Sequence, residues 1–90
     1  MTTSSGAAPA GIAPRVLDNR SAPCAIGLIR AARLMADLPA GSVLDIWSRD
    51  RFAPMEVPLW AERDGYAAER LADIGRWPRK HMVFRVAKPA

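Results

Sequence analysis

The sequence predicts an α/β two-layer sandwich in which two helices cover one face of a four-stranded mixed sheet. Two kinds of pattern predict this fold class. Residues 42–48 and 81–86 alternate apolar and polar side chains, as strands do when one face of a sheet is buried. Apolar residues recur at three- and four-residue spacing over residues 24–38 and again after residue 54, as on the buried face of a helix. The order of these segments along the chain is βαβαββ.

The first half of the chain predicts a tail, a strand and a helix. Residues 1–14 contain too few large apolar side chains to form a core, so we expect a disordered N-terminal tail followed by a single domain over residues 15–88. The apolar residues 16 and 17 predict a short first strand, which a loop connects to the first helix. This helix should cover residues 24–38, where Pro39 and a nearby glycine stop it.

The second half predicts three strands and the second helix. Leu44 and Ile46 share the face of the strand over residues 42–48 that should meet the core, whereas Trp47 falls on the opposite face. The helix should begin at residue 54 or 55 and end at Asp64, with Gly65 as its C-cap. Weak alternation predicts a third strand over residues 66–74, and a turn over residues 75–79 leads to the last strand. The residues of the last strand that should point inward are Met82, Phe84 and Val86.

Charge and cysteine usage narrow the functional classes. The formal net charge is +4, from 13 Lys and Arg against 9 Asp and Glu, and the basic residues are scattered along the chain. Such a balance is more typical of a solvated surface than of a nucleic-acid site. The single cysteine excludes an internal disulfide, a CxxC redox pair and a cysteine-based zinc cluster. Without a signal peptide or an apolar run of about 20 residues, we expect a soluble cytoplasmic protein.

The only cysteine, Cys24, falls at the predicted start of the first helix. Pro23 disfavours helical geometry at the residue before it, which places Cys24 at the N-cap or in the first turn. The free N–H groups and the positive end of the helix dipole stabilise a thiolate there, so the position predicts a lowered pKa for the Cys24 thiol. The alternative explanation is a small buried residue that closes a strand–helix joint.

Several segments together resemble the TusA/SirA-like family of small sulfur carriers. Members of that family have a strand that ends in Leu-Asp, a Cys-Pro-x-Pro sequence that opens a helix, and an Asp-Ile-Pro-x-Trp sequence in the next helix. Here Leu17-Asp18 precedes Cys24, and Glu56-Val57-Pro58-Leu59-Trp60 is followed by Gly65 at the family spacing. The end of the chain, residues 84–88, is similar to the family's Phe-x-Ile-Arg-Lys. The resemblance covers about residues 15–88.

The chain departs from the family pattern at the cysteine motif and after the second helix. Ala25 and Gly27 replace both prolines of Cys-Pro-x-Pro, and Tyr66 replaces the usual histidine. Proline at the first helical position fixes φ and helps to hold the cysteine at the end of the helix dipole. Its loss loosens the expected helix start but leaves the cysteine in place.

The resemblance implies that Cys24 accepts sulfane sulfur as a persulfide and passes it to a partner enzyme. We expect no cofactor, no metal and no membrane association. The implied partners are a cysteine desulfurase or another sulfur donor protein and a sulfur-accepting enzyme. Family members serve tRNA thiolation, molybdenum-cofactor work or sulfur oxidation, and the sequence does not choose among these pathways. A lone cysteine suits a carrier, because a disulfide oxidoreductase commonly needs a resolving cysteine. Basic residues that could attract an acidic donor are Arg20, Arg30, Arg33 and Arg49.

Two other functional classes stay open at this point. One is a thiol-independent protein-interaction or regulatory module of the same fold, which would use Trp47, Trp77 and the arginine surface. The other is an RNA-binding module, whose phosphate contacts would weaken steeply as salt rises. His81 has no serine, aspartate or second histidine placed to form a catalytic triad and is expected at the surface. Asp18 and Asp50 follow strands, where we expect loop or helix-capping roles.

Overall fold

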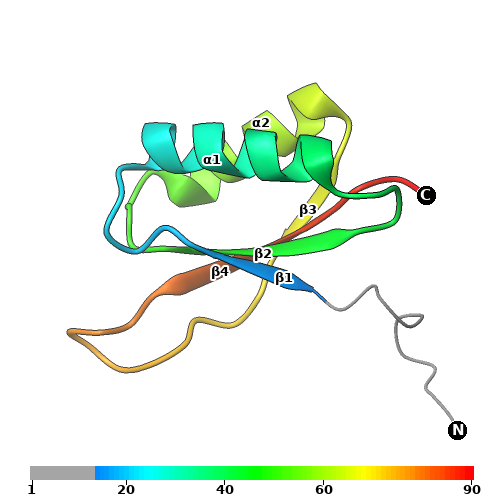
Figure 1. Ribbon diagram of the computed structural model, residues 1–90. Coiled ribbons are helices and arrows are strands. Elements are labelled where there is room, and N and C mark those ends of the chain that lie inside the picture. Colours follow the sequence, from blue (N-terminus) through cyan, green and yellow to red (C-terminus); the bar gives the residue numbers. More distant parts are fainter. Residues whose placement is uncertain (1–13) are drawn as a thin grey trace, which may run out of the picture.

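A computed structural model describes residues 14–90 and has the element order that the sequence predicts (Figure 1). The strands are β1 (Arg15–Asp18), β2 (Val43–Ser48), β3 (Ala67–Arg70) and β4 (Met82–Ala87), and the helices are α1 (Cys24–Asp37) and α2 (Ala53–Asp64). The predicted N-terminal tail, residues 1–14, lies outside the described residues except for Pro14. Within residues 14–90, neither helix has the length and apolar composition needed to cross a membrane.

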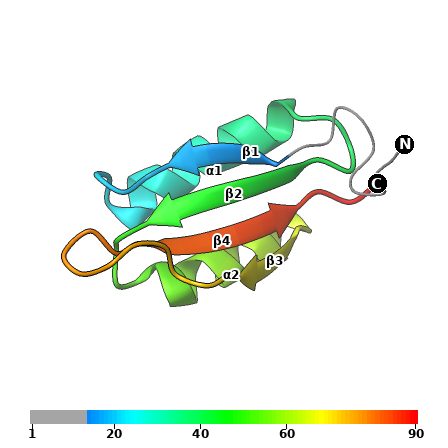
Figure 2. The ribbon, with the colours of Figure 1, turned by 90° about the horizontal axis from the view of Figure 1, so that it is seen from below.

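The four strands form one mixed sheet in the order β1-β2-β4-β3. β1 runs parallel to β2 with Leu17 opposite Ile46, and β2 pairs antiparallel with β4, where Phe84 lies opposite Ile46. β3 and β4 form an antiparallel hairpin at the other edge. Both helices lie on the same face of this sheet (Figure 1, Figure 2). The predicted α/β two-layer sandwich is therefore confirmed.

The core lies between the sheet and the two helices. Leu44 and Ile46 of β2 are buried, as their alternation predicts, and Phe84 and Val86 of β4 pair with them across the sheet. The helices add Ala31, Met35, Val57, Trp60 and Ala61. Because burying one large apolar side chain contributes roughly 1.5–3 kcal/mol, this layer holds the helices in a fixed position on the sheet.

The helix ends follow from local chemistry. α1 ends one residue before the predicted position, and Leu38 is extended because Pro39 follows it. α2 begins at Ala53, one residue earlier than predicted, so that Pro54 lies in the first turn, where a helix needs no N–H donor. The predicted cap of α2 is confirmed: Gly65 has a φ of 83°, in the left-handed region that favours glycine.

The third strand is shorter than the predicted strand over residues 66–74. β3 covers only Ala67–Arg70, after which Arg70 pairs with Asp73 at 3.1 Å and the chain leaves the sheet edge. Beyond β3, the Leu71 N–H still donates to the Val83 carbonyl at 2.9 Å, and the backbone groups of Ile74 and His81 then exchange two hydrogen bonds of 2.9 Å at an isolated bridge. The last strand is displaced by one residue from the predicted range, because His81 belongs to this bridge.

The outer face of the sheet corrects the prediction for His81. This residue is expected at the surface, yet it is only 5% exposed, and Val83 on the same face is also buried. The Trp47 ring packs beside His81 with ring centroids 5.0 Å apart, and the Arg20 guanidinium lies 5.0 Å from the indole centroid. Large side chains on adjacent strands thus cover each other. Trp47 is half-buried in this cluster, so it is not an isolated exposed ring.

Candidate functional site

The candidate site is built at the start of α1, where the single cysteine lies. Cys24 is the first helical residue and Pro23 is the N-cap, so the predicted position in the first turn is confirmed. The Cys24 backbone N–H donates to Asp50 Oδ2 at 2.8 Å, and Asp50 Oδ1 accepts from the Phe52 N–H at 2.8 Å. One carboxylate from the loop after β2 therefore holds the starts of both helices, and the expected capping role of Asp50 is confirmed.

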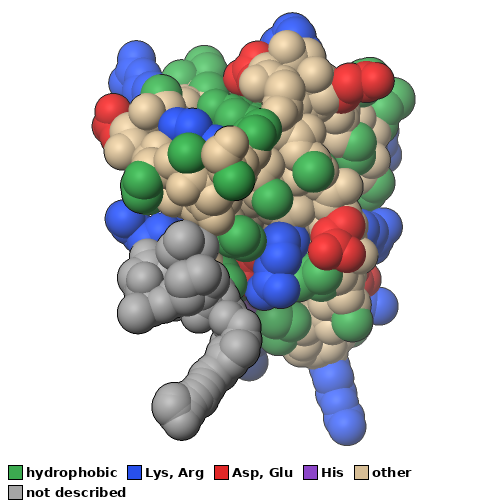
Figure 3. Space-filling model, turned by 90° about the vertical axis from the view of Figure 1, so that its right-hand side faces the viewer, with side chains coloured by type: hydrophobic (Ala, Val, Ile, Leu, Met, Phe, Trp, Pro, Cys, Tyr) green, Lys and Arg blue, Asp and Glu red, His purple; other side chains and the backbone are tan. Residues whose placement is uncertain are grey.

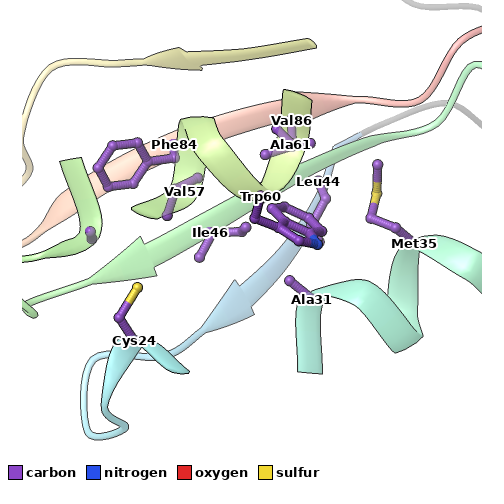
Figure 4. Close-up of a cluster of buried hydrophobic side chains, with 11 residues drawn as sticks. Cys24, Ala31, Met35, Leu44, Ile46, Val57, Trp60, Ala61, Phe84 and Val86 are labelled. Carbon is purple, nitrogen blue, oxygen red and sulfur yellow. The ribbon is translucent and has the colours of Figure 1, made fainter. Parts of the chain in front are cut away.

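The Cys24 thiol faces the core. Its side chain points from α1 toward Ile46 and Val57 (Figure 4), and only 7% of the residue is exposed. Burial first, and then the nearby carboxylates of Glu56 and Asp50, raise the pKa of the Cys24 thiol to about 12. The predicted lowering of this pKa is therefore wrong. The helix dipole favours a thiolate, but withdrawal from water and two negative neighbours outweigh it.

A small cavity of about 10 Å³ adjoins the thiol. A cavity of this size holds about one water-sized group. Asn19, from the loop after β1, forms one wall, and its Nδ2 donates to the Gly27 carbonyl at 3.1 Å. Because Gly27 has no side chain, the amide packs directly against the first turn of α1. The remaining walls are Cys24, Leu28, Ile46, Ser48 and Val57.

Two residues of this site, Asn19 and Glu56, are not among the predicted site residues. Asn19 lies in a segment for which the sequence pattern predicts only a connecting loop. The one signal in the sequence was Gly27 in place of the family's second proline, because a glycine leaves space for another side chain. Glu56 belongs to the segment that carries the family resemblance, but spacing cannot show that the first turns of α1 and α2 face each other. Within residues 14–90, no group of three or more His, Cys, Asp or Glu side chains could hold a metal ion.

Two of the four candidate partner-binding arginines meet near this end of α1. They border a polar hollow of about 340 Å³, lined by Asp18, Arg20, Ser21, Arg49 and Arg79. Arg20 is held by Asp18, with Nη2 2.7 Å from Oδ2, and this hydrogen bonding lowers the pKa of Asp18 to about 2. Arg49 instead donates to the Pro78 carbonyl, which fixes the guanidinium without neutralising it.

The other two candidates, Arg30 and Arg33, are exposed on α1 and do not line this hollow. The predicted basic surface is therefore divided between the loops that follow β1 and β2, which carry Arg20 and Arg49, and the exposed side of α1. On the end of the molecule seen in Figure 3, by contrast, basic and acidic side chains are interspersed.

An apolar groove of about 420 Å³ lies between α1 and α2. Its lining includes Ile29 and Leu59, which are 57% and 60% exposed. Ala25, next to Cys24 in the chain, and Glu56, whose carboxylate acts on the thiol, also line it. The buried sulfur is therefore adjoined by an accessible apolar surface.

Proline at the two positions of the family motif should have opposite consequences here. Ala25→Pro should change the free energy of unfolding by less than about 1 kcal/mol, because the second residue of α1 needs no N–H donor. Gly27→Pro should destabilise by about 3 kcal/mol or more, because the Gly27 N–H donates to the Pro23 carbonyl at 2.9 Å and an added Cβ would collide with Asn19. Thermal unfolding followed by circular dichroism measures both. An equally large loss in Ala25→Pro would mean that α1 begins before Cys24 in solution.

Comparisons with known proteins agree with this architecture. A protein-family model described as sulfurtransferase TusA matches residues 15–88. Among solved structures, the crystal structure of a SirA-like protein from Desulfitobacterium hafniense is similar, with a TM-score of 0.65 and 22% identity, over 83% of this chain and 97% of that chain. At this identity the likeness supports the fold alone. No curated protein matches the chain.

Proposed function

Because this chain belongs to the TusA sulfurtransferase family, we propose that it is a sulfur carrier whose single cysteine, Cys24, holds sulfane sulfur as a persulfide. The observation that carries the proposal is the position of this cysteine at the first residue of α1, where the family motif places its cysteine. The proposed donor is a cysteine desulfurase or another persulfide-bearing protein, and the proposed acceptor is a sulfur-using enzyme. A reducing cytoplasm suits a chain with one free thiol.

The transfer step needs no oxidant. The Cys24 thiolate attacks the outer sulfur of the donor persulfide, so a new S–S bond forms at Cys24 while the donor's S–S bond breaks. The donor leaves as a thiolate and takes up a proton. In delivery the roles reverse: the acceptor's nucleophile takes the outer sulfur, and Cys24 leaves as the thiolate and is protonated again.

The buried thiol sets a condition on this step. Cys24 is only 7% exposed, so a donor persulfide reaches the sulfur only after the first turn of α1 has moved. The raised pKa of the buried thiol also leaves almost no thiolate at neutral pH. Besides the helical bond from the Gly27 N–H to the Pro23 carbonyl, two side-chain contacts hold this turn, namely the Cys24 N–H to Asp50 and the Asn19 amide to Gly27. We infer that the donor opens this turn when it docks. Once the sulfur is hydrated and away from Glu56, the helix dipole favours the thiolate.

Sulfur transfer from a cysteine desulfurase tests this function. The protein is incubated with the desulfurase and cysteine radiolabelled at sulfur, and is then separated from both. We expect about one labelled sulfur per chain, released by reductant or by an added thiol acceptor. The Cys24→Ser variant should carry no label, because no other residue can hold sulfane sulfur. Equal labelling of Cys24→Ser and the wild type would contradict the proposal.

Charge reversal on α1 should slow loading without lowering stability. Arg30→Glu combined with Arg33→Glu reverses two exposed charges on the helix that begins with Cys24. Exposed charges act mainly on association rate, so we expect about tenfold slower loading at low salt and a smaller difference at high salt. The matched control is Arg15→Glu with Arg70→Glu, an equal change of charge on the two edge strands, β1 and β3. Equal slowing in both double variants would mean that net charge alone controls the approach of the donor.

A further inference from the structure

The cavity beside Cys24 contains an unused hydrogen-bond acceptor. Asn19 is only 4% exposed, and its Nδ2 donates to the Gly27 carbonyl. Its Oδ1 is buried and accepts no hydrogen bond from the part of the chain that the structure describes. A buried amide oxygen without a donor is costly and therefore rare in folded proteins. Asn19 and Cys24 are walls of the same cavity, so the side chain with the unpaired oxygen lies beside the cysteine.

The placement of Asn19 depends on the glycine that replaces the second proline of the family motif. A Cβ at residue 27 would lie 2.6 Å from Asn19 Nδ2, 3.0 Å from its Cγ and 3.3 Å from its Cβ. A proline at this position would therefore exclude the amide from the first turn of α1. Gly27 therefore leaves the space that the proline ring would fill, and the Asn19 amide occupies this space with a polar group.

We propose that this cavity holds the outer sulfur of the Cys24 persulfide, and that Asn19 Oδ1 accepts the hydrogen bond from its S–H group. The inference rests on the proposed function, because it assigns where the carried sulfur is kept. A persulfide adds one sulfur atom to Cys24, and the cavity of about 10 Å³ admits about one water-sized group. The group that the cavity would hold is thus a small, neutral S–H donor.

The other walls of the cavity leave this role to Asn19. Ser48 is the second polar wall, and its Oγ already accepts the Asp50 N–H at 3.1 Å. The three remaining side chains besides Cys24 are apolar, namely Leu28, Ile46 and Val57. Among the walls of this cavity, Asn19 Oδ1 is the acceptor that has no donor, and an S–H group in an apolar cavity gains most from it. The Glu56 carboxylate, which acts on the unloaded thiol, is not a wall of this cavity and lines the groove between the helices instead.

Storage in this cavity explains how sulfur stays on the protein between donor and acceptor. Burial and the carboxylates of Glu56 and Asp50 disfavour a negative charge on sulfur, so they favour the protonated persulfide. The neutral form is a weak nucleophile, and the surrounding walls keep small reductants away from it. Asn19 is thus a positioning residue, which acts on the stored sulfur and not on the attack.

The test loads the full chain with inorganic polysulfide, which donates sulfane sulfur without a partner protein. Cyanide then takes the outer sulfur as thiocyanate and returns the Cys24 thiol, and the rate of this loss gives the lifetime of the persulfide. Alkylation of the unloaded thiol measures in parallel how far the site opens. Asn19→Ala should speed persulfide loss by a factor about five times larger than the factor by which it speeds alkylation of the unloaded thiol. This difference is expected for the loss of one buried hydrogen bond. Gly27→Ala, which keeps the amide but displaces it, should act in the same direction.

Val86→Ala, at a fully buried position of β4 that does not line the cavity, is the control for a general loss of stability. It should change persulfide loss and thiol alkylation in equal proportion. If Asn19→Ala speeds persulfide loss and thiol alkylation by the same factor, the inference is overturned, because Asn19 would then only hold its loop in place. Failure of Cys24 to take sulfur from polysulfide under conditions in which the same thiol is alkylated would overturn it as well. A protein that loads from polysulfide but from no desulfurase and no other persulfide-bearing protein would contradict the proposed function instead, and the lifetimes would still decide the role of Asn19.

Discussion

Cys24 should react with iodoacetamide about a thousandfold more slowly at neutral pH than an exposed cysteine does. The thiolate is the reacting form, and the pKa of the Cys24 thiol is about 12, against an ordinary value of 9.0. The ionised fraction therefore falls by about three powers of ten. The rate should also keep rising with pH well above 9, because the folded protein holds the thiol proton to a higher pH. A rate at neutral pH close to that of an exposed cysteine would mean that the thiol is uncovered in solution.

The same experiment separates the causes of the raised pKa. Glu56→Gln removes the negative charge that acts on the thiol most strongly after burial, and it should speed alkylation at neutral pH by about tenfold. Glu62→Gln makes the same chemical change at an exposed position of α2 and should leave the rate unchanged. If the two variants behave alike, the carboxylate of Glu56 does not face the thiol.

Phe84→Ala should cost about 3–5 kcal/mol of stability. Phe84 is 1% exposed and lies opposite Ile46 in the middle of the sheet, so its removal leaves a large cavity in the core. Because domains are stable by only about 5–15 kcal/mol, this variant should be partly unfolded under mild conditions. Urea unfolding measures the loss, and Phe84→Leu, which keeps most of the volume, should cost clearly less. A loss below about 1 kcal/mol would contradict the placement of Phe84 in the core.

The fold could be predicted because its signals are local. The alternation of Leu44 and Ile46 and the glycine cap at Gly65 each depend on a few neighbouring residues, and both are confirmed. The predicted length of the third strand is wrong because its local alternation signal is weak. Its charged second half allows Arg70 and Asp73 to pair with each other, and the chain bends away from β4.

The sequence predicts where the candidate site lies, but not that its thiol is buried and has a raised pKa. Spacing and Pro23 place Cys24 at the start of α1, and the structure agrees. The burial of its thiol depends on α2, whose first turn brings Glu56 toward it from a distant part of the sequence. The same limitation explains His81, which is covered because Trp47 lies on the adjacent strand. Contacts between elements decide both cases, and a single sequence does not reveal them.

The departure from the family motif also has a structural meaning that the sequence left open. The replaced prolines predicted only a looser helix start. In the structure, Gly27 lets the Asn19 amide pack against α1, and its bond to the Gly27 carbonyl supports the first turn. The helix start is therefore held from outside by Asn19 and Asp50, in place of the rigid φ that proline would have supplied.

The mass of the intact protein after incubation with a cysteine desulfurase and cysteine tests the central claim most directly. If Cys24 is the carrier, the wild type should gain the mass of one sulfur atom, located on the peptide that contains Cys24, and should lose it when a reductant is added. Cys24→Ser should keep its original mass. No gain with several desulfurases that load another carrier in the same assay, or a gain that persists in Cys24→Ser, would contradict the assignment of sulfur carriage to this cysteine.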